Sequence, residues 1–190
     1  MFRYILFDFD GTLYDTVEGI SKSVQYTLEK YGIEAELDSL RCFAGPPLVD
    51  KFMEEFGFTY EKASEARVLF QERYVPVGVY ESSPFPGMQP FLEALRDAGL
   101  ILAVATSKPL PLCEELLERS GMRDYFSVVC GSELKGNNSS KMEIVERTIA
   151  SLGAEKEDCV LIGDTKYDVI GAHAAGVPCI CVRYGYAAPG

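Results

Sequence analysis

The sequence is poor in the residues that build zinc centres, with a single histidine and no two cysteines in CxxC spacing. Structural and catalytic zinc sites are made from clustered Cys and His ligands, so a zinc-dependent protein is not expected. The six cysteines are instead expected to be buried, reduced thiols. Cys179 and Cys181 lie two residues apart in an apolar run, and we expect both to pack in the core.

Positive charge is also scarce, since 18 Lys and Arg residues face 29 Asp and Glu residues, for a net charge of -11. The electrostatic attraction that brings proteins to phosphate backbones or anionic lipids is therefore missing. Nucleic acid polymers and membranes are not expected as partners. An acidic protein that handles an anionic substrate must concentrate positive charge locally, through a bound cation or a few placed lysines.

No segment approaches the roughly 18 uncharged apolar residues that a membrane-spanning helix requires. The opening residues, MFRYILFDFD, also lack the basic start, long apolar stretch and small-residue cleavage site of a secretory signal. The protein is therefore expected in the cytoplasm.

Five short, nearly continuous apolar runs predict parallel strands that are covered on both faces. Helical patterns separate the last four, and this β-α repetition predicts an open parallel sheet with right-handed crossovers, a three-layer Rossmann-like α/β fold. The runs are RYILFDF (3–9), LILAVAT (100–106), YFSVVCG (125–131), CVLIGD (159–164) and VPCICVR (177–183).

The interval between the first and second runs is far longer than one crossover helix needs. It contains amphipathic helical patterns, such as Ile20, Val24 and Leu28 at a spacing of four. We therefore predict a catalytic core made of residues 1–15 and 83–190 and an inserted helical cap made of residues 16–82.

Polar residues follow several of these runs, and the carboxyl ends of parallel strands share one edge of a sheet. Asp8 lies near the end of the first run and Asp10 follows it, Thr106 ends the second run and Asp164 ends the fourth, while Lys141 opens a helix. Crowded carboxylates need a cation, and Mg²⁺ suits oxygen ligands. Asp8 could attack phosphorus, Asp10 could act as general acid and base, and Mg²⁺, Lys141 and Thr106 could hold the phosphoryl charge.

Four segments resemble, in order and spacing, the motifs of the haloacid dehalogenase superfamily. They are Asp8-Phe9-Asp10-Gly11-Thr12-Leu13-Tyr14-Asp15, Thr106-Ser107, Lys141 and Gly163-Asp164-Thr165-Lys166-Tyr167-Asp168. The resemblance implies a nucleophile at Asp8, an acid/base and metal contact at Asp10, metal binding by Asp8 and Asp164 as well, and a supporting carboxylate at Asp168. It also implies phosphate binding by a set of residues that surrounds the nucleophile, namely Asp8, Phe9, Asp10, Thr106, Ser107 and Lys141.

The resemblance is strongest to the phosphoglycolate phosphatase-like group. Within that group, the stretches 43–48 (FAGPPL) and 104–109 (VATSKP) resemble the bacterial 5′-nucleotidase subgroup. The implied activity is Mg²⁺-dependent hydrolysis of a small phosphate monoester, either a nucleoside 5′-monophosphate or a phosphoglycolate-like acid, by a monomer or weak homodimer. Asp10 argues against dehalogenation, which has no leaving alcohol to protonate.

Two alternatives remain open at the level of sequence. A phosphosugar mutase would return the phosphoryl group to a sugar, and a regulatory module would bind phosphate without turnover. The bacterial receiver domain, a regulatory module, also combines an acidic pair, an aspartate that is phosphorylated, a Thr and a Lys around Mg²⁺. The substrate, the pathway, the oligomeric state and continuation of the natural chain beyond Gly190 are not fixed by the sequence. Lys108 could face substrate or solvent, and solvent is the simpler expectation.

Overall fold

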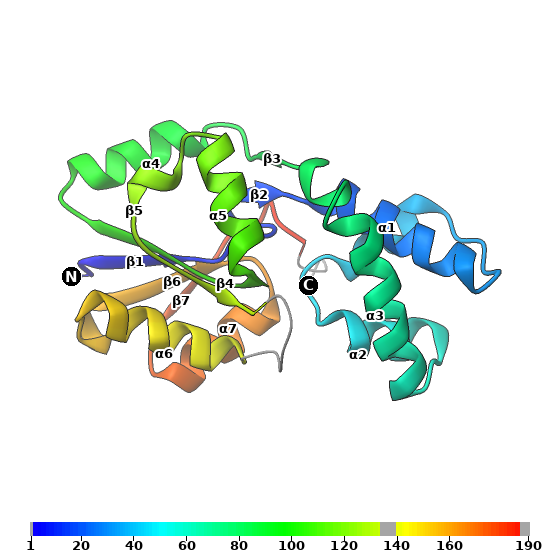
Figure 1. Cartoon of the computed structure of the whole chain (residues 1–190). Helices are drawn as coiled ribbons and strands as arrows, with labels where there is room; N and C mark the ends of the chain where they lie inside the picture. The colour runs from blue at the N-terminus through cyan, green and yellow to red at the C-terminus, as the bar shows by residue number, and fades with distance from the viewer. Residues whose placement is uncertain (1, 134–139, 187–190) are drawn as a thin grey trace. The chain divides into compact units, whose positions relative to one another are not determined.

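The computed structural model describes residues 2–133 and 140–186, which divide into two compact units (Figure 1). The first unit comprises Met1–Tyr14 and Pro84–Gly190, and the second comprises Asp15–Ser83, one residue more at each end than the predicted insert. Two short strands, β2 (Tyr14–Asp15) and β3 (Ser83–Pro84), pair where the chain passes from one unit to the other.

The first unit is built on a five-stranded sheet in which every neighbouring pair is parallel. The strands follow the order β5-β4-β1-β6-β7, so the first strand lies at the centre and the chain winds outward in both directions from it. Their bounds are β1 Tyr4–Phe7, β4 Ile101–Pro109, β5 Phe126–Ser132, β6 Cys159–Gly163 and β7 Cys179–Cys181. The predicted parallel sheet is confirmed.

Helices cover both faces of this sheet, with α4 and α5 on one side and α6 and α7 on the other (Figure 1). Leu6 and Leu161 pack toward α6, where Ile144 and Val145 are fully buried with them. On the opposite face the Phe7 ring contacts Phe91 of α4 at a centroid distance of 6.4 Å. The bounds are α4 Met88–Asp97, α5 Leu110–Arg119, α6 Lys141–Leu152 and α7 Lys166–Ala175, with short 3-10 helices at Arg123–Tyr125 and Lys156–Asp158.

Burial on both faces explains why the strands read as continuous apolar runs rather than as alternating patterns. The exception is β7 at the sheet's edge, where Cys181 is exposed and Cys179 is half-buried. The expectation that Cys181 packs in the core is therefore wrong, because an edge strand of three residues has a neighbour on one side only. Cys42 of the second unit is exposed as well, so the prediction of buried thiols is wrong at these two cysteines. Across the described ranges, no helix has the length and apolar character to cross a bilayer.

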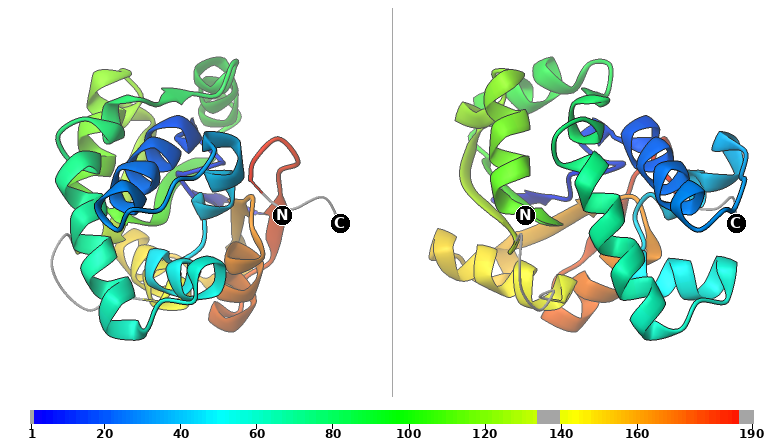
Figure 2. Two further views of the ribbon diagram at one scale, coloured as in Figure 1. Left: turned by 90° about the vertical axis from the view of Figure 1, so that its right-hand side faces the viewer. Right: turned by 45° about the vertical axis from the view of Figure 1, so that its right-hand side comes forward.

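The second unit is helical, and its main helices are α1 (Val17–Lys30), α2 (Leu48–Phe56) and α3 (Tyr60–Tyr74). Helices α1 and α3 lie side by side (Figure 2). Short 3-10 helices span Leu37–Phe43 and Gly78–Tyr80. An aromatic cluster forms its core, with ring contacts among Phe43, Phe52, Phe56 and Phe58.

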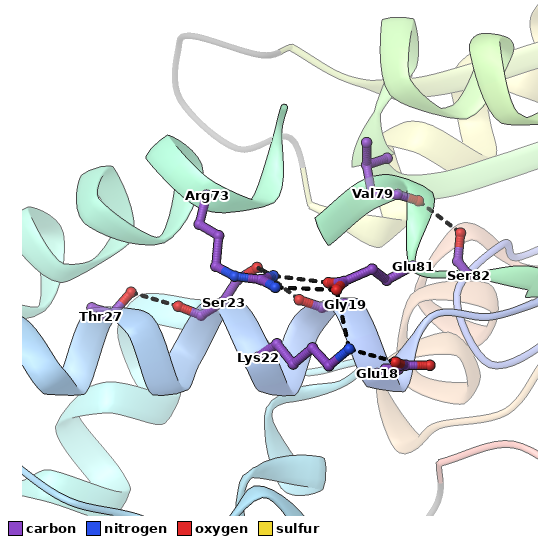
Figure 3. A network of polar contacts seen from close by, with 9 residues as sticks. All are labelled: Glu18, Gly19, Lys22, Ser23, Thr27, Arg73, Val79, Glu81 and Ser82. Carbon is purple, nitrogen blue, oxygen red and sulfur yellow. Dashed lines mark hydrogen bonds and ion pairs between the residues drawn. The ribbon is translucent and has the colours of Figure 1, made fainter. Parts of the chain in front are cut away.

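A polar network joins α1, α3 and the segment around Glu81, which follows α3 in this second unit (Figure 3). The Arg73 guanidinium donates two hydrogen bonds to the Glu81 carboxylate, at 2.9 and 3.1 Å, and a third to the Ser23 hydroxyl at 3.1 Å. Lys22 bridges Glu81 and Glu18 at 3.1 and 2.5 Å. A bidentate arginine–carboxylate pair fixes the orientation of both groups, so the network holds the segment around Glu81 against α1 and α3.

Candidate active site

The central position of β1 determines where the first aspartate lies. Its neighbours are β4 and β6, so the carboxyl ends of three strands meet on either side of it, which is the usual place for a site in an open α/β sheet. Asp8 follows β1 directly, and its backbone N–H donates to the Ile162 carbonyl of β6 at 2.8 Å. Asp8 is buried, with 8% of its surface exposed.

Lys141 joins two of the predicted carboxylates. Its Nζ lies 2.6 Å from Asp8 Oδ1 and 2.8 Å from Asp168 Oδ1, and its side chain is 8% exposed. Helix α6 begins at this lysine, after a Ser140 cap whose hydroxyl accepts from the Glu143 N–H. Burial opposes the charge of Lys141, but the two aspartates outweigh it and raise its pKa.

Gly171 of α7 makes room for this lysine. A Cβ built at Gly171 would lie 2.5 Å from Lys141 Cγ and 2.6 Å from Lys141 Cβ, which is closer than real side-chain carbons approach. Any larger residue at this position must displace the lysine stem. The packing of α6 against α7 therefore positions the ammonium group over Asp8.

Asp168 is tied to the backbone as well as to Lys141. Its Oδ2 accepts from the Thr165 N–H and hydroxyl, both at 2.9 Å, and from the Asp164 N–H at 3.2 Å. Burial alone would raise the pKa of Asp168, but the charge of Lys141 and these hydrogen bonds outweigh burial and lower it. Asp168 thus both caps α7 and neutralises the lysine.

Asp164 receives hydrogen bonds from two distant segments. Its Oδ2 accepts from the Tyr186 backbone N–H at 2.7 Å, and its Oδ1 from the Thr12 hydroxyl at 3.5 Å. Burial raises the pKa of Asp164 to about 6, and the same cause raises the pKa of Asp8 against the opposing charge of Lys141. Gly11 and Gly185 must stay small, because a Cβ at either would overlap the Asp164 side chain.

Asp8, Asp164 and Asp168 offer carboxylate oxygens that all lie within 4.8 Å of one another. Three buried carboxylates at this spacing repel one another unless a cation lies among them, and Lys141 supplies one positive charge. The excess negative charge and the all-oxygen donor set fit Mg²⁺. Asp8 and Asp164 would hold the ion, because both oxygens of Asp168 are already engaged by Lys141 and by α7.

The end of β4 brings Thr106 and Lys108 to the same face. Both are buried, at 1% and 4% exposed, while Ser107 between them is exposed. The Thr106 Oγ1 accepts from the Lys108 N–H at 3.2 Å, and the Lys108 ammonium lies 2.9 Å from Asp10 Oδ1. The Asp10 carboxylate is thus paired with Lys108 and stands apart from the three clustered aspartates.

Sequence reasoning missed two features of this region. Lys108 does not face solvent, because a carboxylate from another part of the first unit neutralises it inside the protein. The segment ending at Tyr186 was not expected to touch the site, yet Tyr186 binds Asp164 and the Tyr184 hydroxyl donates to the Thr12 carbonyl at 2.9 Å. Phe9 is fully buried and stacks on Tyr14 at 4.5 Å, so its side chain belongs to the core.

Comparison with known proteins identifies the family to which this fold belongs. The family model described as haloacid dehalogenase-like hydrolase matches residues 5–182. The chain belongs to the haloacid dehalogenase-like hydrolases. The superfamily resemblance carried by the four sequence motifs is thereby confirmed, and the sheet with helices on both faces is the fold of this family.

Similar proteins are named for different activities. A 5′-nucleotidase of Pseudomonas aeruginosa is 43% identical over 183 residues, which are 96% of this chain and 83% of the relative. The tyrosine-protein kinase PtkA of Mycobacterium tuberculosis is 36% identical over 97% of this chain, but only 63% of that relative is covered. The crystal structure of a predicted phosphatase from Clostridium acetobutylicum superposes with a TM-score of 0.94 at 40% identity, covering 99% of this chain and 88% of that one.

Proposed function

We propose that this chain is a Mg²⁺-dependent phosphatase that hydrolyses small phosphate monoesters through an aspartyl-phosphate intermediate on Asp8. The observation that carries the proposal is the contact of Lys141 with both Asp8 and Asp168, beside Asp164, at the carboxyl edge of the sheet. This places a buried nucleophile, a fixed cation and a metal-binding carboxylate together, as phosphoryl transfer requires.

In the first step Asp8 attacks phosphorus with one carboxylate oxygen while Lys141 holds the other. The P–O bond to the substrate alcohol breaks, and Asp10 gives its proton to the departing oxygen. Bound Mg²⁺ supplies positive charge that offsets the negative charge of the phosphoryl oxygens. Lys141 and the Thr106 hydroxyl hold those oxygens from the protein side.

In the second step the Asp10 carboxylate takes a proton from water, and the water oxygen attacks the phosphorus of the aspartyl phosphate. Inorganic phosphate leaves and Asp8 is regenerated. One carboxyl group therefore serves as acid and then as base, which is why a second aspartate two residues from the nucleophile is needed.

For the substrate, the proposal favours nucleoside 5′-monophosphates, with phosphoglycolate-like acids as the second choice. Support comes from the 5′-nucleotidase relative, most of whose length this chain covers, and from the FAGPPL and VATSKP stretches. No observation favours a phosphosugar mutase or a regulatory module without turnover.

The test is inorganic phosphate release from a panel of nucleoside 5′-monophosphates, phosphoglycolate and sugar phosphates. We expect release by the wild type with Mg²⁺, and none with EDTA or from the Asp8→Asn variant. A folded wild-type protein that releases phosphate from no member of the panel would refute the proposal. Isomerisation of a sugar phosphate without phosphate release would favour the mutase instead.

A further inference from the structure

We propose that Lys108 is a positioning residue that holds the Asp10 carboxylate in place for proton transfer to the leaving group. The inference rests on the proposed phosphatase reaction and adds a residue to it. The contact that motivates it is the ion pair between Lys108 Nζ and Asp10 Oδ1 at 2.9 Å, in which the lysine side chain is 1% exposed and the aspartate side chain 20%.

A lysine this deeply buried needs a partner, because burial of an unpaired ammonium group is very costly. Asp10 provides that partner, and the Phe9 ring lies 5.4 Å below the ammonium as a second favourable contact. The Lys108 side chain is thus fixed inside the protein, while Asp10 is the member of the pair that is more accessible to solvent and substrate. An arrangement with a rigid buried cation and a reachable carboxylate suits a group that must meet substrate in one orientation.

The backbone around Lys108 is held in place independently of Asp10. The register of β4 with β5 is irregular between Ala105 and Pro109, and pairing resumes at Pro109 with Ser132. A Cβ at Gly131 of β5 would lie 2.6 Å from the Lys108 carbonyl oxygen, so only glycine permits this close approach. Irregular strand ends often redirect a side chain toward a site, and here the redirected side chain is Lys108.

Lys108 also connects the acid/base to the phosphate-binding hydroxyl. Its own N–H donates to Thr106 Oγ1 at 3.2 Å, while its ammonium contacts Asp10. A single residue therefore sets the distance between the proton donor and a group that is proposed to hold the phosphoryl oxygens. An error of about 1 Å in such placement can cost roughly 10²-fold in rate.

The test compares two substrates that differ in their need for an acid. An alkyl phosphate such as a nucleoside 5′-monophosphate leaves as a basic alkoxide and needs the proton, whereas p-nitrophenyl phosphate leaves as a stable phenolate. If Lys108 positions Asp10, Lys108→Met lowers the rate of the first step, measured in a single turnover, by roughly 10²-fold on the alkyl phosphate and by less than about threefold on p-nitrophenyl phosphate. Lys156→Met is the matched control, because Lys156 pairs with Glu146 on the exposed surface.

A double-mutant cycle with Asp10→Asn separates positioning from other roles. In the Asp10→Asn background, Lys108→Met is expected to change the rate of the p-nitrophenolate burst by less than about twofold, since the group it positions is gone. This double variant removes both charges of the pair, so it keeps the test available if Lys108→Met alone does not fold, as judged by circular dichroism.

Three results overturn the inference. One is an equal loss of the first-step rate on both substrates, and a second is a loss confined to KM, which would make Lys108 a phosphate-binding cation. The third is the same further loss from Lys108→Met whether or not Asp10 is intact. A wild-type protein that turns over neither substrate refutes the phosphatase proposal itself, and the inference with it.

Discussion

Individual side chains at the candidate site work against the stability of the metal-free fold. Burial raises the pKa of Asp164 from 3.8 to about 6, so the folded protein holds this proton in a range where the unfolded chain has lost it. Between about pH 4 and 6 the folded state therefore binds more protons than the unfolded chain, and stability falls as the pH rises.

We therefore predict that Asp164→Asn flattens the pH dependence of the unfolding free energy in EDTA. The shift at Asp164 corresponds to about 3 kcal/mol lost by the wild type across this range. Urea unfolding at several pH values between 4 and 7 measures it. If the wild type and the variant show the same slope, Asp164 is not the group whose ionisation is opposed by burial.

At the scale of elements, the close packing of α6 on α7 controls where Lys141 lies. Alanine is normally a better helix residue than glycine, by about 1 kcal/mol, so Gly171→Ala would stabilise an isolated helix. Here the added methyl overlaps the Lys141 stem and must displace it. We expect phosphate release to fall by at least roughly tenfold, as is typical when a group that stabilises transition-state charge is misplaced.

His173→Ala on the same helix is the control, since His173 is exposed and the substitution also raises helix propensity. Its phosphate release is expected to match that of the wild type. Equal activity of Gly171→Ala and wild type would mean that the lysine does not depend on this packing.

A second prediction at the scale of elements concerns the segment from Tyr184 to Tyr186. The Tyr186 N–H donates a hydrogen bond to Asp164 Oδ2, and proline at this position has no N–H to donate. We expect Tyr186→Pro to weaken Mg²⁺ binding, measured by calorimetry, by roughly 10-fold or more, in the range seen when groups that orient metal ligands are removed.

Tyr186→Phe keeps the backbone donor and removes only the hydroxyl, so its Mg²⁺ affinity should stay within about twofold of the wild type. If both variants bind Mg²⁺ as the wild type does, the C-terminal segment has no part in holding Asp164.

Elements were easier to predict from the sequence than contacts between distant residues. The apolar runs gave the strands, because burial on both faces leaves a local signature, and Lys141 was placed correctly at a helix start. The pairing of Lys108 with Asp10 joins positions 98 residues apart, and only the i, i+2 spacing of Thr106 and Lys108 hinted that both share a face. The Tyr186 contact with Asp164 uses a backbone N–H, which every residue except proline carries, so the residue type could not predict it.

At the scale of the whole molecule, the chain combines a sheet that gathers the proposed catalytic groups at one edge with a separate helical unit inserted after the first strand. The groups proposed for chemistry, from Asp8 to Asp168, all belong to the first unit. The second unit has its own aromatic core and its own polar network around Glu81. The proposed reaction therefore draws all of its catalytic groups from the first unit.

The most direct test of the account asks whether Asp8 carries the phosphoryl group. Asp10→Asn lacks the base for the second step, while p-nitrophenyl phosphate needs no acid in the first. With Mg²⁺, this variant should release one equivalent of p-nitrophenolate in a burst, and mass spectrometry after acid quenching should find a phosphoryl group on the peptide containing Asp8. A wild type that turns over steadily, beside a variant with neither burst nor label at Asp8, would contradict the account.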